Sequence, residues 1–129
     1  MFLPYSNDHG AVAPWEYLSA AAGTYQAGQA LNVSGGKLAA ISAASTAKPA
    51  YICMASATVA DGDNLPVIRV QNDTIYETTL SAAASSAAVG TKLQIAAGGL
   101  QANGAAAGAF EVVYLDGTAV DSIVRGRFV

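Results

Sequence analysis

His9 is the one histidine in the 129-residue chain, and it directly follows Asp8. A histidine beside an acid can act as a general base when a nucleophile lies within reach. The sequence holds no serine in a Gly-x-Ser-x-Gly context to fill that role. We therefore interpret Asp8 and His9 as solvated polar residues or part of a turn, and we predict no catalytic triad.

A metal site would need clustered histidine, cysteine or acidic residues. The nearest candidate is the segment 61–64, Asp-Gly-Asp-Asn, which lacks the other ligands of an EF-hand loop and its terminal glutamate. This composition is typical of a turn, with an adventitious calcium site as the alternative. We expect no metal and no cofactor.

Three glutamates, Glu16, Glu77 and Glu111, are the remaining candidates for acid–base chemistry. Each falls in a separate strand-like segment, so an acid–base pair among them would depend on the fold. That pairing stays open as an alternative. The leading interpretation is that the protein is not an enzyme and has no catalytic residues.

The composition limits the classes of partner. The chain is 53% hydrophobic and 12% charged with a net charge of −3, and its six basic residues are scattered, which argues against nucleic acid. Its apolar runs are too short to span a bilayer, and its first residues do not resemble a signal peptide, so we expect synthesis in a cytoplasm and no membrane partner.

The single cysteine, Cys53, lies in an apolar run and is predicted to be buried.

The chain reads as short strands separated by glycine-rich or Asx-Gly turns, which predicts one all-β domain. We expect a small β-barrel or β-sandwich of seven or eight short strands, with at most one short helix in the alanine-rich stretches. Residues 29–33 and 37–41 form the clearest hairpin. Residues 67–70 and 75–79 are predicted to form a second, and 110–115 leads into the last strand. The predicted turn glycines are Gly35, Gly36, Gly98, Gly99 and Gly117, of which Gly36 and Gly117 are expected at positive φ.

Residues 1–17 are predicted to form an extended N-terminal arm, followed by the β-domain at 18–129. The first fifteen residues show no helical or strand period and are punctuated by proline and glycine. Aromatic and apolar side chains of this kind supply contact area at interfaces. The predicted contact residues are therefore Phe2, Leu3, Tyr5 and Trp15, with an arm folded back on its own core as the alternative.

Taken in order along the chain, a set of short motifs resembles the small capsid decoration, or cement, proteins of tailed bacteriophages. The motifs are Pro14-Trp15-Glu16-Tyr17-Leu18, Tyr25-x-x-Gly28-x-Ala30-Leu31, Ser34-Gly35-Gly36-Lys37-Leu38, Lys48-Pro49-x-Tyr51-Ile52, Leu65-Pro66-Val67-Ile68-Arg69-Val70 and Val112-Val113-Tyr114-x-Asp116-Gly117. The resemblance implies a small β-barrel or β-sandwich displayed in many copies on the outside of an icosahedral head. It supplies no catalytic residues.

The expected function is that of a structural virion protein that binds the outside of the head and stabilises contacts between major capsid subunits. Its expected partners are the major capsid protein and copies of itself, and its expected location is the capsid surface after synthesis in the bacterial cytoplasm. Two alternatives stay open. One is another virion subunit, such as a tail-tube or head-fibre protein. The other is a carbohydrate-binding module, suggested by Trp15 and the six tyrosines.

Overall fold

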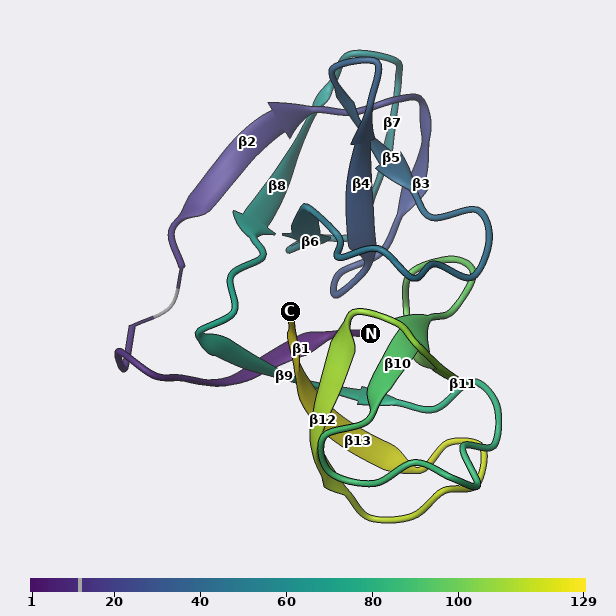
Figure 1. Cartoon of the computed structure of the whole chain (residues 1–129). Helices are drawn as coiled ribbons and strands as arrows, with labels where there is room; N and C mark the ends of the chain where they lie inside the picture. Colours follow the sequence, from purple (N-terminus) through teal and green to yellow (C-terminus); the bar gives the residue numbers. More distant parts are fainter. Residues whose placement is uncertain (12) are drawn as a thin grey trace.

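The protein is all-β. The computed structural model describes residues 1–11 and 13–129, and within these ranges it contains thirteen strands in three antiparallel sheets and no helix (Figure 1). Val12, part of the predicted arm, lies outside the described residues. No helix in the described ranges could cross a membrane.

The largest sheet has six strands and the second has five, and a two-stranded ribbon completes the fold. In spatial order, the six-stranded sheet consists of β1 (Leu3–Asn7), β9 (Thr74–Thr79), β13 (Ile123–Phe128), β12 (Phe110–Leu115), β10 (Lys92–Ile95) and β11 (Ala102–Ala106). The five-stranded sheet consists of β2 (Trp15–Ser19), β8 (Asn64–Arg69), β6 (Tyr51–Cys53), β4 (Ala30–Ser34) and β5 (Lys37–Ala40). The ribbon pairs β3 (Gly23–Tyr25) with β7 (Ala57–Val59).

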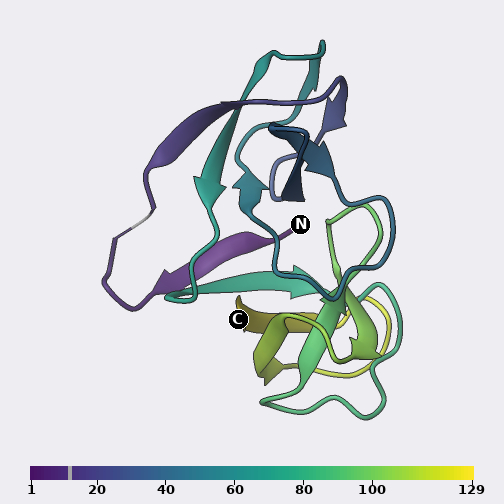
Figure 2. The same ribbon diagram turned by 45° about the horizontal axis from the view of Figure 1, so that its top comes forward.

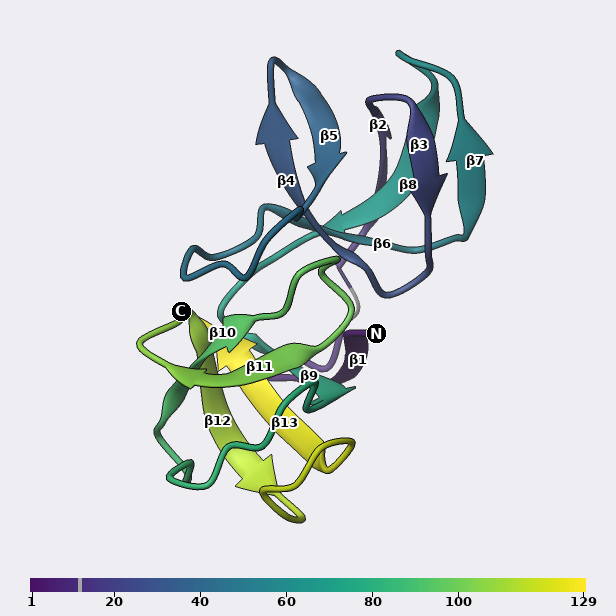
Figure 3. The ribbon, with the colours of Figure 1, turned by 90° about the vertical axis from the view of Figure 1, so that its right-hand side faces the viewer.

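The five-stranded sheet packs against both of the other sheets, and its central strand, β6, is buried on both faces. Successive residues of a strand point to opposite faces, and in β6 this places Ile52 in one hydrophobic cluster and Tyr51 and Cys53 in another. The first cluster joins this sheet to the six-stranded sheet, and the second joins it to the ribbon. Figure 3 shows the six-stranded sheet below and the other two above.

The two larger sheets form a sandwich, not a barrel. One isolated bridge, between Ala20 and Leu38, brings the two ends of the five-stranded sheet together, but the strands themselves do not close. Of the two architectures expected from the sequence, the sandwich is therefore the one observed. The larger cluster, which joins the sheets, is centred on four aromatic rings, Phe2, Tyr76, Phe110 and Phe128, with neighbouring centroids 5.1–5.4 Å apart.

The N-terminal segment is not a free arm. Leu3–Asn7 forms β1, an edge strand paired with β9, and Trp15–Ser19 forms β2, paired with β8. A β-bulge between Pro4 and Ser6 interrupts the alternation of β1, and this is why the sequence shows no strand period there. Figure 2 shows β1 lying along β9 as part of the lower sheet.

Two further sequence predictions about strands were wrong. The described residues hold thirteen strands rather than seven or eight, because strands of three residues, such as β3 and β7, are too short to show a period. The predicted second hairpin does not form either. Its first strand, β8, belongs to the five-stranded sheet and its second, β9, to the six-stranded sheet, so the turn at residues 72–73 carries the chain from one sheet to the other.

The predicted hairpin at residues 29–41 is confirmed as β4 and β5. Its turn residues Gly35 and Gly36 have φ of 57° and 76°, a geometry that glycine adopts without steric cost. The prediction for Gly117 was wrong, since it is not among the residues at positive φ. The connection between β12 and β13 spans residues 116–122, and the positive φ falls on Asp121, at 65°.

Candidate functional site

The residues predicted to be chemically inert are held in structural contacts. His9 Nε2 lies 3.8 Å from an Asp73 carboxylate oxygen at an exposed position. Cys53 is buried as predicted, and desolvation raises the pKa of its thiol above the ordinary value. A low thiol pKa is what makes a cysteine reactive, so this shift favours a packing role.

The acidic residues of the chain also take part in structural contacts. In the turn at 61–64, Asp61 pairs with Lys37 at 2.6 Å and Asp63 accepts a hydrogen bond from the Ala60 amide. Glu16 pairs with Arg69 at 3.0 Å in the five-stranded sheet. Within residues 1–11 and 13–129 there is no group of three or more histidine, cysteine or acidic residues that could hold a metal.

Of the four predicted contact residues, Phe2 needs correction. Its ring is fully buried among Phe110 and Phe128, so it cannot meet a partner while the sandwich is intact. Leu3, Tyr5 and Trp15 are 46%, 55% and 50% exposed and stay candidates. The structure does not bring these three together on one surface. Leu3 and Tyr5 lie on the six-stranded sheet and Trp15 on the five-stranded sheet.

Trp15 belongs to a surface of two aromatic residues on β2. It shares one face of the strand with Tyr17, which is 64% exposed, because residues two apart in a strand point the same way. We call this pair the β2 surface. Tyr17 was not among the predicted contact residues, although the alternation Trp-Glu-Tyr-Leu already indicated that it accompanies Trp15.

The β2 strand is at the edge of its sheet. Its inner edge pairs with β8, from Trp15 opposite Ile68 to Ser19 opposite Asn64. Within the described part of the chain, no strand pairs with its outer edge between Trp15 and Ser19. The backbone groups along that edge are therefore available to another chain.

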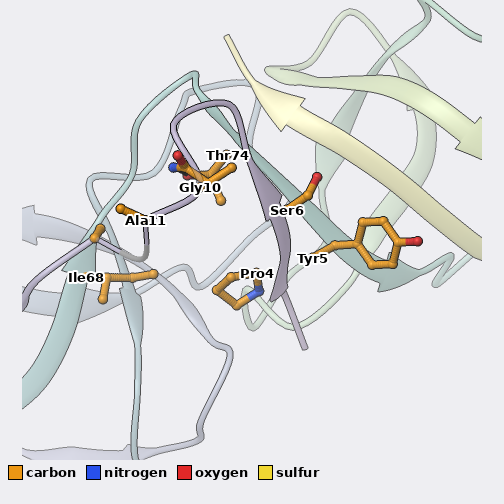
Figure 4. Close-up of a pocket in the computed structure, with 9 residues that line it drawn as sticks. Pro4, Tyr5, Ser6, Gly10, Ala11, Ile68 and Thr74 are labelled. Atoms are coloured by element: carbon orange, nitrogen blue, oxygen red, sulfur yellow. Dashed lines mark hydrogen bonds between the residues drawn. The ribbon is translucent and has the colours of Figure 1, made fainter.

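A cavity of about 350 Å³ lies near the start of β2, although neither Trp15 nor Tyr17 lines it. It lies between β1 and β8, and its walls include Pro4, Ala13 and Ile68, the last of which is the cross-strand neighbour of Trp15. Figure 4 shows Pro4 and Ile68 on opposite sides of this space, with Thr74 and Ser6 along it. The walls are mostly apolar, so the cavity suits an apolar side chain.

A second exposed group lies on the outer face of the six-stranded sheet. The guanidinium carbon of Arg125 lies 4.0 Å from the ring centroid of Tyr5 and 4.7 Å from that of Tyr114. Arg125 Nε also donates a hydrogen bond of 2.7 Å to Glu77, which raises the pKa of Arg125 above its ordinary value. We call Tyr5, Arg125 and Tyr114 the tyrosine–arginine row.

Sequence reasoning missed most of this row. Tyr5 was predicted to be a contact residue, but nothing in the sequence indicates that Arg125 and Tyr114 accompany it. Simple alternation from Val112 would place Tyr114 on the buried face with it. A bulge between Val112 and Tyr114 reverses the direction of Tyr114, and bulges leave no reliable sequence signal.

The predicted turn glycines differ in how open their surroundings are to another molecule. Gly35 and Gly36 lie at an open hairpin tip with no atom near the position a Cβ would take. The turn at Gly98 and Gly99 instead packs on the start of β4, where the Ala30 amide donates to the Gly99 carbonyl at 2.7 Å. Both glycines of the first turn are therefore open to another molecule, whereas Gly99 in the second turn is buried against β4.

Comparison with known proteins adds no relative. Neither a protein-family model nor a curated protein matches this chain.

Proposed function

We propose that this protein is a capsid decoration protein of a tailed bacteriophage that attaches to the outside of the head through its β2 surface. The partner in this proposal is the major capsid protein, and the protein acts by bridging neighbouring capsid subunits. Support comes from the order of the sequence motifs, from the small β-sandwich that the resemblance implies and from the exposed aromatic edge of β2.

The observation that carries the proposal is the combination of Trp15 and Tyr17 with an unpaired strand edge. Large aromatic side chains are usually well covered, yet both are at least half exposed. Tryptophan and tyrosine are the residue types that dominate binding energy at protein interfaces. Their position on an edge strand allows a partner to bind both the side chains and the backbone.

The geometry favours attachment by strand addition. In this mode an extended segment of a capsid subunit pairs with the outer edge of β2, and main-chain hydrogen bonds supply affinity. An apolar side chain near that segment can enter the cavity beside Ile68, which supplies specificity. Few charges are buried by such contacts, so their desolvation costs little.

The test is a binding experiment with undecorated heads of the phage whose genome encodes the chain. The double variant Trp15→Ala/Tyr17→Ala is expected to lose at least about tenfold in apparent affinity, because a factor of ten requires only about 1.4 kcal/mol. The matched control is Tyr114→Ala, which truncates a similarly exposed tyrosine on the other sheet. Sedimentation of heads with bound protein measures the occupancy.

Both variants are expected to melt near the wild-type temperature, since the truncated rings are exposed. If the double variant saturates the heads as readily as the wild type, the β2 surface is not the attachment site. If the wild type itself fails to bind, the decoration function is contradicted.

A further inference from the structure

Two β-bulges direct the tyrosine–arginine row onto a single exposed face. In β1, Pro4 pairs with Tyr76 and Ser6 with Ile75, which leaves Tyr5 as the extra residue of a bulge. In β12, the bulge at Val113 turns Tyr114 outward, opposite Arg125. Bulges interrupt the hydrogen bonds of a sheet, and they recur where a side chain must be re-aimed for function.

The central arginine of the row keeps most of its donors open. A guanidinium carries five N–H donors. Among the described residues, only Nε of Arg125 has a hydrogen-bond acceptor, which is Glu77 Oε2. The side chain is nevertheless only 27% exposed, because Tyr5 and Tyr114 approach it from opposite sides along the sheet. Its outer N–H groups are therefore held in place without a protein partner.

A hollow of about 340 Å³ adjoins this row at Glu77. Its walls include Leu3, Thr79 and Ile123, which lie on the same outer face of β1, β9 and β13. Thr79 Oγ1 accepts a hydrogen bond from Gln101 Nε2, so its own proton is free to be donated. The face thus combines apolar walls, a carboxylate acceptor, a hydroxyl and fixed guanidinium donors.

The charges on this face favour a neutral ligand. Arg125 and Glu77 already neutralise each other at 2.7 Å. Met1 also lines the hollow, and burial lowers the pKa of its α-amino group, which favours the uncharged amine. An added carboxylate or phosphate would lie next to the Glu77 carboxylate, and an added cation would meet Arg125. A polyhydroxyl ligand carries no charge, and it can offer donors to Glu77 and acceptors to Arg125 at once.

From these observations we propose that the hollow at Glu77 and the adjoining tyrosine–arginine row bind a neutral oligosaccharide. One ring of the ligand occupies the hollow between Leu3 and Ile123. A neighbouring ring packs its apolar C–H face on the exposed ring of Tyr5 and receives hydrogen bonds from Arg125. This site is separate from the β2 surface, and the inference does not depend on the proposed attachment to phage heads.

The experiment screens the purified full-length protein against an array of neutral and acidic oligosaccharides, followed by calorimetric titration of the strongest neutral one. Saturable binding to neutral oligosaccharides is the expected result. The variants Tyr5→Ala and Arg125→Lys are each expected to weaken it at least about tenfold. Arg125→Lys keeps the positive charge and removes the planar set of donors, so it separates hydrogen-bond geometry from charge.

Trp15→Ala serves as the matched control, because it truncates an equally exposed aromatic residue on the other sheet and should leave the affinity unchanged. Melting temperatures of all variants report whether the fold persists. The inference is overturned if no neutral oligosaccharide binds saturably, if acidic oligosaccharides are preferred, or if Trp15→Ala abolishes binding while Tyr5→Ala does not. If the tyrosine–arginine row binds the phage head instead, the wild type should bind no saccharide, and Tyr5→Ala should lose binding to heads.

Discussion

At the scale of single residues, neighbouring positions in the N-terminal strand have opposite roles. Phe2 is fully buried against Phe110 and Phe128, while Leu3 beside it is 46% exposed. The backbone supports this placement, because the Phe2 amide donates to the Gly28 carbonyl at 2.7 Å. Phe2 therefore holds β1 to the sandwich, whereas Leu3 and Tyr5 stay exposed.

This difference gives the first prediction. Phe2→Ala is expected to destabilise the fold by about 3–5 kcal/mol, the usual cost of removing a buried phenylalanine ring. Leu3→Ala, one position away and exposed, should change the stability by about 0.5 kcal/mol or less. Chemical denaturation of both variants measures the difference. Equal and small effects would mean that β1 is a free arm after all.

Tyr76 provides a second test, through pH. Desolvation by burial, with a smaller contribution from the charge of Asp73, raises the pKa of Tyr76 from 10.0 to about 12. The folded state thus favours the neutral phenol, and this part of the stability is complete below pH 10 and is lost as the pH rises toward 12. The pKa of Tyr25 is also raised, so the wild type must be compared with Tyr76→Phe.

The measurement is the free energy of unfolding as a function of pH between about 9 and 12. Tyr76→Phe should show a shallower decline over this range than the wild type, because it has one fewer buried phenol to ionise. Parallel curves would indicate that Tyr76 titrates with its ordinary pKa and that its ring is accessible to water.

At the scale of elements, turns that look alike in sequence have different structural roles. The Gly-Gly pairs at 35–36 and 98–99 both end a predicted strand, and both have positive φ. The first is an open hairpin tip. The second packs against β4, and the Gly98 amide also donates to the Ile41 carbonyl at 2.7 Å. The second turn thus connects the six-stranded sheet to the five-stranded sheet.

Alanine substitutions at Gly36 and Gly99 separate these roles. The two residues have nearly the same φ, 76° and 73°, so the backbone strain of a Cβ should be similar, about 1 kcal/mol. At Gly36 a Cβ meets no atom within 4 Å, whereas at Gly99 it would overlap the Ala30 carbonyl oxygen. Gly99→Ala should therefore lower the melting temperature clearly more than Gly36→Ala. Similar shifts would contradict the packing of the second turn on β4.

Some elements could be predicted from the sequence and others could not, for physical reasons. The hairpin of β4 and β5 was predictable because its strands alternate and its turn needs glycine. The pairing of β8 could not be predicted, because the turn at 72–73 looks like a hairpin turn in the sequence. Whether such a turn pairs two strands or joins two sheets depends on which face of each strand is buried. The direction of Tyr114 depends on a bulge, which no local pattern in the sequence reveals.

At the scale of the whole molecule, the protein presents two exposed aromatic surfaces on different sheets. The β2 surface combines Trp15 and Tyr17 with an unpaired strand edge, and the tyrosine–arginine row lies on the outer face of the six-stranded sheet. A module with two such surfaces can attach through one and present the other. The proposed attachment to a phage head and the proposed saccharide site use these surfaces separately, so each can fail without the other.

The decoration function is tested most directly by imaging phage particles made with and without the gene for this chain. Three-dimensional reconstruction of the two kinds of particle gives the position and the number of copies. The account predicts density of the size of this protein at repeated, symmetry-related positions on the outside of the head, present only when the gene is intact. Density confined to the tail or to a single vertex, or particles that are identical in both cases, would contradict it.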